Sequence, residues 1–89
     1  MESFIICYDL HEKNTENYNK LREKIKSFGK WARVVESTWI ITSDKTAKEI
    51  RDSLSEVISE DDRIFVTKSS GIGAWHNTRC SNEWLKNNL

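Results

Sequence analysis

Residues 31–42 read WARVVESTWIIT, and the architecture of the whole chain follows from how this stretch is arranged. Valine, isoleucine, threonine and tryptophan dominate it, and these residue types favour extended strands. The polar pair Glu36-Ser37 interrupts the apolar run, which predicts two strands joined by a tight hairpin turn. One long bent strand is the alternative interpretation.

Helical patterns flank this stretch on both sides. Before it, apolar residues at three- and four-residue spacing predict a helix of about four turns, which starts within residues 14–17 and stops at Gly29. The apolar residues of this first helix are Tyr18, Leu21, Ile25 and Phe28. After the stretch, Thr46 and Glu49 have the spacing of a capping box, which predicts the start of a second helix. Its buried face is expected to consist of Ala47, Ile50, Leu54, Val57 and Ile58.

Two more strands are predicted outside the helices. Residues 4–8, FIICY, form a short apolar run closed by Asp9, which is typical of a central strand covered on both faces. Residues 63–68, RIFVTK, form a further strand after an acidic turn. Beyond a glycine-containing loop, Ser81 can cap a short terminal helix over residues 83–85.

The order of these elements predicts an α+β fold. Strand, helix, hairpin, helix and strand give a ferredoxin-like sandwich (β-α-β-β-α-β), an antiparallel sheet with two helices on one face. We expect residues 1–89 to form a single domain, because a chain of this length has room for one compact core. The other sheet face is expected to be bare. Together with the surplus of large aromatic residues, this predicts a homodimer with Trp39 or Trp31 partly buried between subunits.

Composition and charge narrow the class of protein. Hydrophobic residues make up 37% of the chain and charged residues 31%, which is typical of folded globular domains. Fourteen basic and fourteen acidic side chains cancel, which argues against sequence-blind binding of long duplex nucleic acid. No apolar run reaches the roughly 18–20 residues of a membrane helix. We therefore expect a cytoplasmic protein with no membrane partner, in which Cys7 and Cys80 are ordinary thiols.

The charges are distributed unevenly along the chain. Residues 18–34 are basic and carry a single acid, Glu23, whereas residues 44–62 are mainly acidic. One interpretation is two solvated helix faces. The other is a polarised surface that binds an anionic ligand or another subunit, with Lys20 and Lys24 as candidate ligand-binding residues.

Short motifs in a fixed order give the chain a family resemblance. They are Tyr8-Asp9-Leu10-His11, then Phe28-Gly29, then RVVESTW at residues 33–39, and RIFV at residues 63–66. The series resembles the CRISPR-associated protein 2 family, and more closely its stand-alone SinR-like relatives. The resemblance implies a ferredoxin-like homodimer in which Asp9 meets its symmetry mate and holds a divalent metal for phosphodiester cleavage, with Ser37 nearby.

The residue types at the candidate site suit this chemistry, and each also has a simpler interpretation. Asp9 ends a buried strand and can hold magnesium, which prefers oxygen ligands and activates water, or it can cap the loop that follows. His11 can act as a general base or phosphate contact, or be a solvated loop histidine. Glu36 and Ser37 can face the same end of the sheet as Asp9, or simply form the hairpin turn.

Two aromatic residues complete the candidate ligand-binding set. Tyr8 immediately precedes Asp9, and Trp75 can either pack in a dimer or stack on a base. The function expected from these features is a small homodimer that binds nucleic acid or a small nucleotide at an inter-subunit cleft, with magnesium-dependent phosphodiesterase or nuclease activity. The alternative is a non-catalytic nucleotide-binding, toxin–antitoxin or assembly module that keeps only the dimeric scaffold.

Overall fold

The computed structural model describes residues 1–12 and 14–89, which form an antiparallel sheet and three helices. In chain order the elements are β1 (Glu2–Asp9), α1 (Thr15–Lys26), β2 (Trp31–Val35), β3 (Thr38–Ser43), α2 (Ala47–Ser55), β4 (Arg63–Lys68) and α3 (Asn82–Asn88). The predicted hairpin at Glu36-Ser37 is confirmed, and so is the ferredoxin-like α+β class. Among the described residues, no helix combines the length and apolarity needed to cross a membrane.

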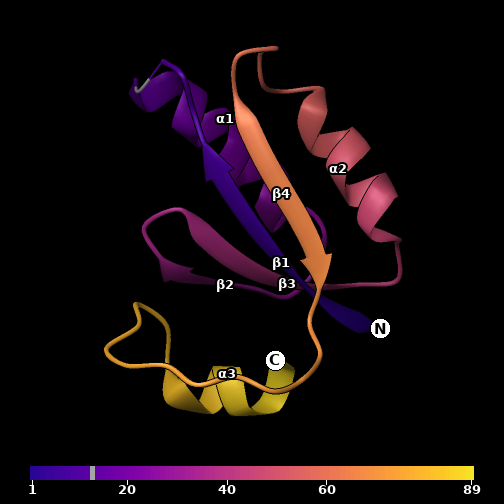
Figure 1. Ribbon diagram of the computed structural model, residues 1–89, viewed down its shortest axis with the longest axis vertical. Coiled ribbons are helices and arrows are strands. Elements are labelled where there is room, and N and C mark those ends of the chain that lie inside the picture. The colour runs from indigo at the N-terminus through magenta and orange to yellow at the C-terminus, as the bar shows by residue number, and fades with distance from the viewer. Residues whose placement is uncertain (13) are drawn as a thin grey trace.

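Strand β1 lies inside the sheet, where it pairs with a strand on each side. The strand order is β2-β3-β1-β4, and each neighbouring pair is antiparallel. Helices α1 and α2 lie against one face of this sheet (Figure 1). The prediction of a central first strand and of two helices on one face is therefore confirmed.

Alternate residues of β1 build the core between the sheet and these two helices. Phe4, Ile6 and Tyr8 are buried on this face, and Ile6 lies opposite Trp39 of β3. The helices contribute the buried residues Leu21, Ile25, Ile50 and Leu54. Trp39 is only 2% exposed, because its register with Ile6 turns it toward the helices. Of the two tryptophans expected between subunits, Trp39 is already enclosed within one chain, so that alternative is wrong and Trp31 stays a prediction.

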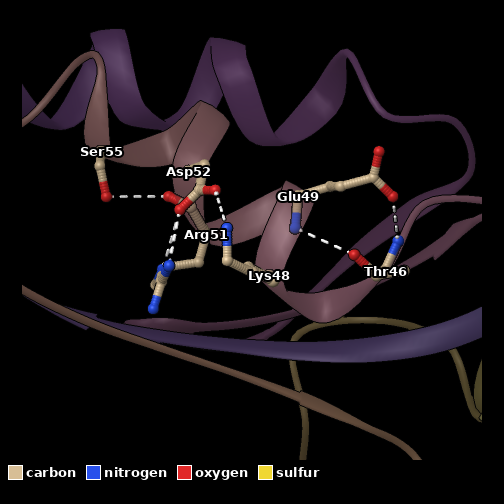
Figure 2. Close-up of polar contacts among 6 residues, drawn as sticks. All are labelled: Thr46, Lys48, Glu49, Arg51, Asp52 and Ser55. Carbon is tan, nitrogen blue, oxygen red and sulfur yellow. Dashed lines mark hydrogen bonds and ion pairs between the residues drawn. The ribbon is translucent and has the colours of Figure 1, made fainter.

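Local interactions set the start of α2 and the turn after α1 where the sequence predicted them, although α2 ends at Ser55, before Val57 and Ile58. The Thr46 hydroxyl accepts from the backbone N–H of Glu49 at 3.1 Å, and the Glu49 carboxylate accepts from that of Thr46 at 2.9 Å (Figure 2). This reciprocal capping box starts α2. At the end of α1, Gly29 has φ 139°, and a Cβ there would lie 2.8 Å from the Thr42 carbonyl oxygen. The chain therefore needs glycine at this turn.

The second face of the sheet is covered only in part. Ala32 and Ile40, which are paired across β2 and β3, are 5% and 4% exposed on this face, and Leu85 of α3 is buried as well. The next row along the strands, the uncovered row, runs through Phe65, Cys7, Thr38 and Val35 of β4, β1, β3 and β2. Phe65 is 63% exposed and Val35 is 47% exposed. The second face, which was expected to be bare, is therefore uncovered only at the end of the sheet that carries the uncovered row.

Backbone contacts hold the C-terminal segment, residues 69–89, against the sheet. The Ser69 N–H donates to the Ser3 carbonyl at 2.8 Å, and the Arg79 N–H donates to the Val34 carbonyl of β2 at 2.8 Å. The Ser3 hydroxyl also donates to the carbonyl of Asn88. In Figure 1 this segment runs from orange to yellow along the side of β2 and β3. It therefore covers one end of the second face and the outer edge of β2.

A buried hydrogen bond within the core gives a test of this packing. The Trp39 indole N–H donates to the Tyr8 hydroxyl at 3.2 Å. Replacing Tyr8 with phenylalanine leaves this buried donor without its acceptor, so Tyr8→Phe is expected to lower the free energy of unfolding by about 1–3 kcal/mol. The control Tyr18→Phe, at a half-buried tyrosine, should lower it by less than about 0.5 kcal/mol. Urea unfolding measures both, and equal losses would contradict the assignment.

Candidate functional site

Asp9 lies at the carboxyl end of β1 on the second face of the sheet. It is directly opposite Arg63 in the register, and the nearest atoms of the two side chains are 3.5 Å apart. The Asp9 side chain is 57% exposed and that of Arg63 is 84% exposed. Strand alternation places Asp9 one row beyond Cys7 and the uncovered row. The carboxylate therefore borders the exposed apolar part of the sheet.

His11 lines a hollow that Asp9 does not line. The intervening residue, Leu10, is buried in the core beneath the helices. His11 lines an open hollow of about 710 Å³ between the start of α1 and the loop after α2, together with Lys20. The structure thus brings two predicted residues, His11 and Lys20, into one hollow, and Asp9 is not among the residues that line it.

A carboxylate in that loop fixes the position of His11. Asp62 accepts from the backbone N–H of His11 at 2.7 Å and from that of Ser59 at 2.9 Å. These hydrogen bonds, that of Ser59 above all, stabilise the charged form and hold the pKa of Asp62 below its ordinary value of 3.8. The hollow is also lined by Glu12, Glu56 and Asp61. Its acidic character disfavours an anionic ligand.

Glu36 and Ser37 form the turn between β2 and β3, at the end of the sheet where β1 finishes. The Tyr8 N–H donates to the Ser37 carbonyl at 3.1 Å, which places the turn beside the end of β1. The Glu36 carboxylate lies 3.3 Å from Arg33 and 3.2 Å from Arg79. Glu36 therefore joins the hairpin to the C-terminal segment.

Three further predicted residues are buried or half-buried. Tyr8 is 6% exposed and its hydroxyl is bonded to Trp39, so we do not place it among surface residues that contact a ligand. Lys24 is half-buried in the last turn of α1. Trp75 is half-buried in the C-terminal segment, where its indole N–H donates to the Asn82 side chain at 3.0 Å.

Sequence reasoning missed the arginines beside the carboxylates of Asp9 and Glu36. Arg63 opens the last strand, and antiparallel pairing of that strand with β1 is what sets it opposite Asp9. The position of Arg63 at the strand start was a usable signal, given the predicted sheet order. Arg79 follows a loop without hydrophobic periodicity, so its contact with Glu36 had no signal in the sequence.

The comparisons with known proteins bear on the fold. No family model matches the chain. A solved structure, the crystal structure of a hypothetical protein TT1823 from Thermus thermophilus, is similar to it with a TM-score of 0.67 and 16% sequence identity. The similarity covers 89% of this chain and 95% of that one. It supports the α+β arrangement of the sheet and helices across most of both chains.

The lowered pKa of Asp62 predicts a pH-dependent contribution to stability. Because the pKa in the folded state lies below 3.8, the carboxylate stabilises the fold above about pH 4, and this contribution is lost as the pH falls through the folded value. Asp62→Asn should therefore be less stable than the parent at pH 7, with the difference shrinking toward about pH 2. Thermal unfolding across this range measures it.

The control for this experiment is Asp61→Asn, which removes the neighbouring exposed carboxylate from the same hollow. In the described part of the chain, no backbone N–H donates to Asp61. Its replacement should leave the stability difference from the parent small and nearly constant with pH. A pH-independent effect of Asp62→Asn would contradict the role assigned to its hydrogen bonds.

Proposed function

We propose that the protein is a homodimer that binds the phosphodiester group of a nucleotide or nucleic acid beside Asp9 and hydrolyses it with magnesium. The observation that carries the proposal is the position of Asp9, an exposed carboxylate at the end of a central strand, bordering an uncovered apolar row. The motif resemblance to the CRISPR-associated protein 2 family points to the same chemistry.

The uncovered row supports the dimer. Phe65 and Val35 are exposed at its two ends, and the half-buried Cys7 and Thr38 lie between them. A continuous strip of apolar and weakly polar side chains across a whole sheet loses contact with water when a second copy covers it. A two-fold axis near this row would bring the two Asp9 carboxylates toward each other, because each lies one row away.

Two carboxylates that approach each other repel unless a proton or cation lies between them. Within residues 1–12 and 14–89, no group of three or more histidine, cysteine, aspartate or glutamate residues is arranged to hold a metal. In this proposal each of the two copies contributes its Asp9 carboxylate. Two carboxylates fit magnesium, which binds few protein oxygens and keeps several waters. When bound, magnesium supplies a water of lowered pKa and positive charge against the phosphodiester.

The chain's own residues have distinct roles in this proposal. Asp9 anchors the ion. Arg63, which is highly exposed and loosely held by Asp9 at 3.5 Å, is placed to contact a phosphate oxygen with its guanidinium donors. Ser37 lies at the same end of the sheet, through its contact with Tyr8, but no interaction joins it to Asp9 in the described residues.

A second candidate function keeps the dimer and omits the chemistry. The observation that favours it is the ion pair itself, since Arg63 already neutralises Asp9 without a metal. In that case the two residues are surface charges at the rim of an assembly module, and an exposed pair of this kind contributes only about 0–1 kcal/mol to stability. The two candidates differ in whether magnesium changes the behaviour of the protein.

The dimer is tested at Phe65. Light scattering of the parent at micromolar concentration is expected to give twice the mass of the chain. Phe65→Asp places a charge in the proposed interface and should weaken dimerisation by more than about ten-fold. Ile72→Asp is the matched control, because Ile72 is also an exposed apolar residue, at 88%, but lies in the C-terminal loop. A monomeric parent at high concentration would rule out the dimer.

The chemistry is tested at Asp9. Labelled RNA, DNA and cyclic dinucleotides are incubated with the parent protein with and without magnesium, and at least one should be cleaved only when magnesium is present. Asp9→Asn should reduce this cleavage by more than about 100-fold, because the ion loses its anchoring carboxylate. The matched control is Asp52→Asn, which changes an aspartate of α2 with 51% exposure that is paired with Lys48 and Arg51 (Figure 2).

The outcomes separate the two candidate functions. Cleavage that survives in Asp52→Asn and is lost in Asp9→Asn supports the hydrolase. No cleavage of any substrate, together with thermal unfolding that magnesium does not change in the parent or in Asp9→Asn, would contradict the hydrolase and favour the assembly module.

A further inference from the structure

A second hollow lies along the outer edge of β2, away from Asp9. It has a volume of about 340 Å³, within the range of about 300–1,000 Å³ that is usual for small-ligand sites. Trp31 and Arg33 of β2 line one side, and Arg79, Ser81 and Trp84 of the C-terminal segment line the other. The hollow therefore exists only because the C-terminal segment runs beside the edge strand. We refer to it as the edge hollow.

The edge hollow has aromatic walls that a flat ring can contact. Trp31 is 42% exposed, although one side of its indole packs against Trp39 at a centroid distance of 5.3 Å. This packing against a fully buried residue holds the Trp31 ring in place. Trp84, from the short helix on the opposite wall, is half-buried. A fixed, partly exposed indole is the kind of surface on which an unpaired base stacks.

Positive charges surround the same aromatic surface. The Lys26 amine lies over the Trp31 ring, 5.0 Å from its centre, and is also paired with the Glu23 carboxylate at 3.5 Å. Arg79 has 53% of its side chain exposed, and among the described residues one of its guanidinium nitrogens is engaged, by Glu36 at 3.2 Å. A guanidinium carries five N–H donors, so most of those of Arg79 remain open to another acceptor. The hollow beside His11, by contrast, is lined by several carboxylates.

We propose that the edge hollow binds one nucleotide of a single-stranded nucleic acid, with the base stacked on Trp31 and the phosphate on Arg79. The charge of the rim matches an anionic backbone, and the aromatic wall matches a base. A single strand fits better than a duplex, because paired bases are stacked inside the helix and do not offer their faces. The inference rests on the proposed function for its class of ligand, but it requires no cleavage.

The test is the affinity of the full-length chain for a fluorescently labelled single strand of about 12 nucleotides, measured by anisotropy without magnesium. Trp31→Leu keeps an apolar side chain but removes the stacking surface, and it should weaken binding by about five-fold or more. Phe28→Leu is the control, because it also replaces a half-buried aromatic residue with leucine but lies outside the edge hollow. Equal weakening in both variants, or none in Trp31→Leu, would overturn the proposal.

A second pair of variants tests the phosphate contact and does not depend on the tryptophans. Arg79→Gln should weaken binding and reduce the slope of log affinity against log salt concentration by about 0.7. Arg51→Gln is closely matched to it, since Arg51 is also 53% exposed and also paired with one carboxylate, that of Asp52 (Figure 2). If both arginine variants lose the same affinity, the interaction is general charge attraction and the proposed site is wrong.

One further measurement completes the test. An abasic strand of the same length should bind at least about five-fold more weakly than the parent oligonucleotide, since it offers phosphates without bases to stack. Equal binding of the abasic strand, or no binding of any single strand, would overturn the proposal.

The failure of this inference can be told apart from the failure of the proposed function. Binding that depends on Trp31 and Arg79, without cleavage by the parent, leaves the edge hollow in place and removes the hydrolase. Cleavage that depends on Asp9, with binding insensitive to Trp31 and Arg79, supports the hydrolase and rules out the edge hollow as the binding site.

Discussion

Strand β1 is hydrogen-bonded to β3 on one side and to β4 on the other, so its side chains have only two directions open to them. Even-numbered residues from Phe4 to Tyr8 enter the core under the helices. Odd-numbered residues from Ile5 to Asp9 must then lie on the second face. A shift of one residue in the register would exchange the two sets and place Asp9 in the core. The division of the sheet into a face packed against the helices and a second, partly exposed face follows from this single alternation.

The same alternation explains how much could be predicted from the sequence. Strong local signals identified the elements: the apolar run at residues 4–8, the polar pair Glu36-Ser37 and the capping box at Thr46 and Glu49. The first strand, however, is apolar at successive positions. A run without alternation does not show which residues face the helices, so neither the burial of Tyr8 nor that of its partner Trp39 could be read from it. Pairing across the sheet settles this, and pairing is a long-range property.

The candidate site shows the same limit. Asp9 could be placed at the end of a strand, but its neighbour Arg63 is 54 positions away in the sequence. The basic segment is also less polarised than its composition indicates, since Lys20 pairs with Glu16 and Lys26 with Glu23 along α1, each at 3.5 Å. These exposed pairs contribute little to stability, but they offset part of the local positive charge. The residues beyond Lys68 have little periodicity, and their cover over β2 had no counterpart in the sequence pattern.

The two edges of the sheet are unequal. The outer edge of β2 has the C-terminal segment beside it, through the hydrogen bond from Arg79 to Val34, whereas β4 has no strand on its outer side in the described part of the chain. A sheet with two open edges can add copies without limit and grow into a fibre. With a single open edge, two copies can pair through their β4 strands only once. The two outer edges of the joined sheet are then both β2, which the C-terminal segment lies beside, so no further copy can add. The C-terminal segment thus leaves β4 as the edge of the described sheet at which another strand could pair.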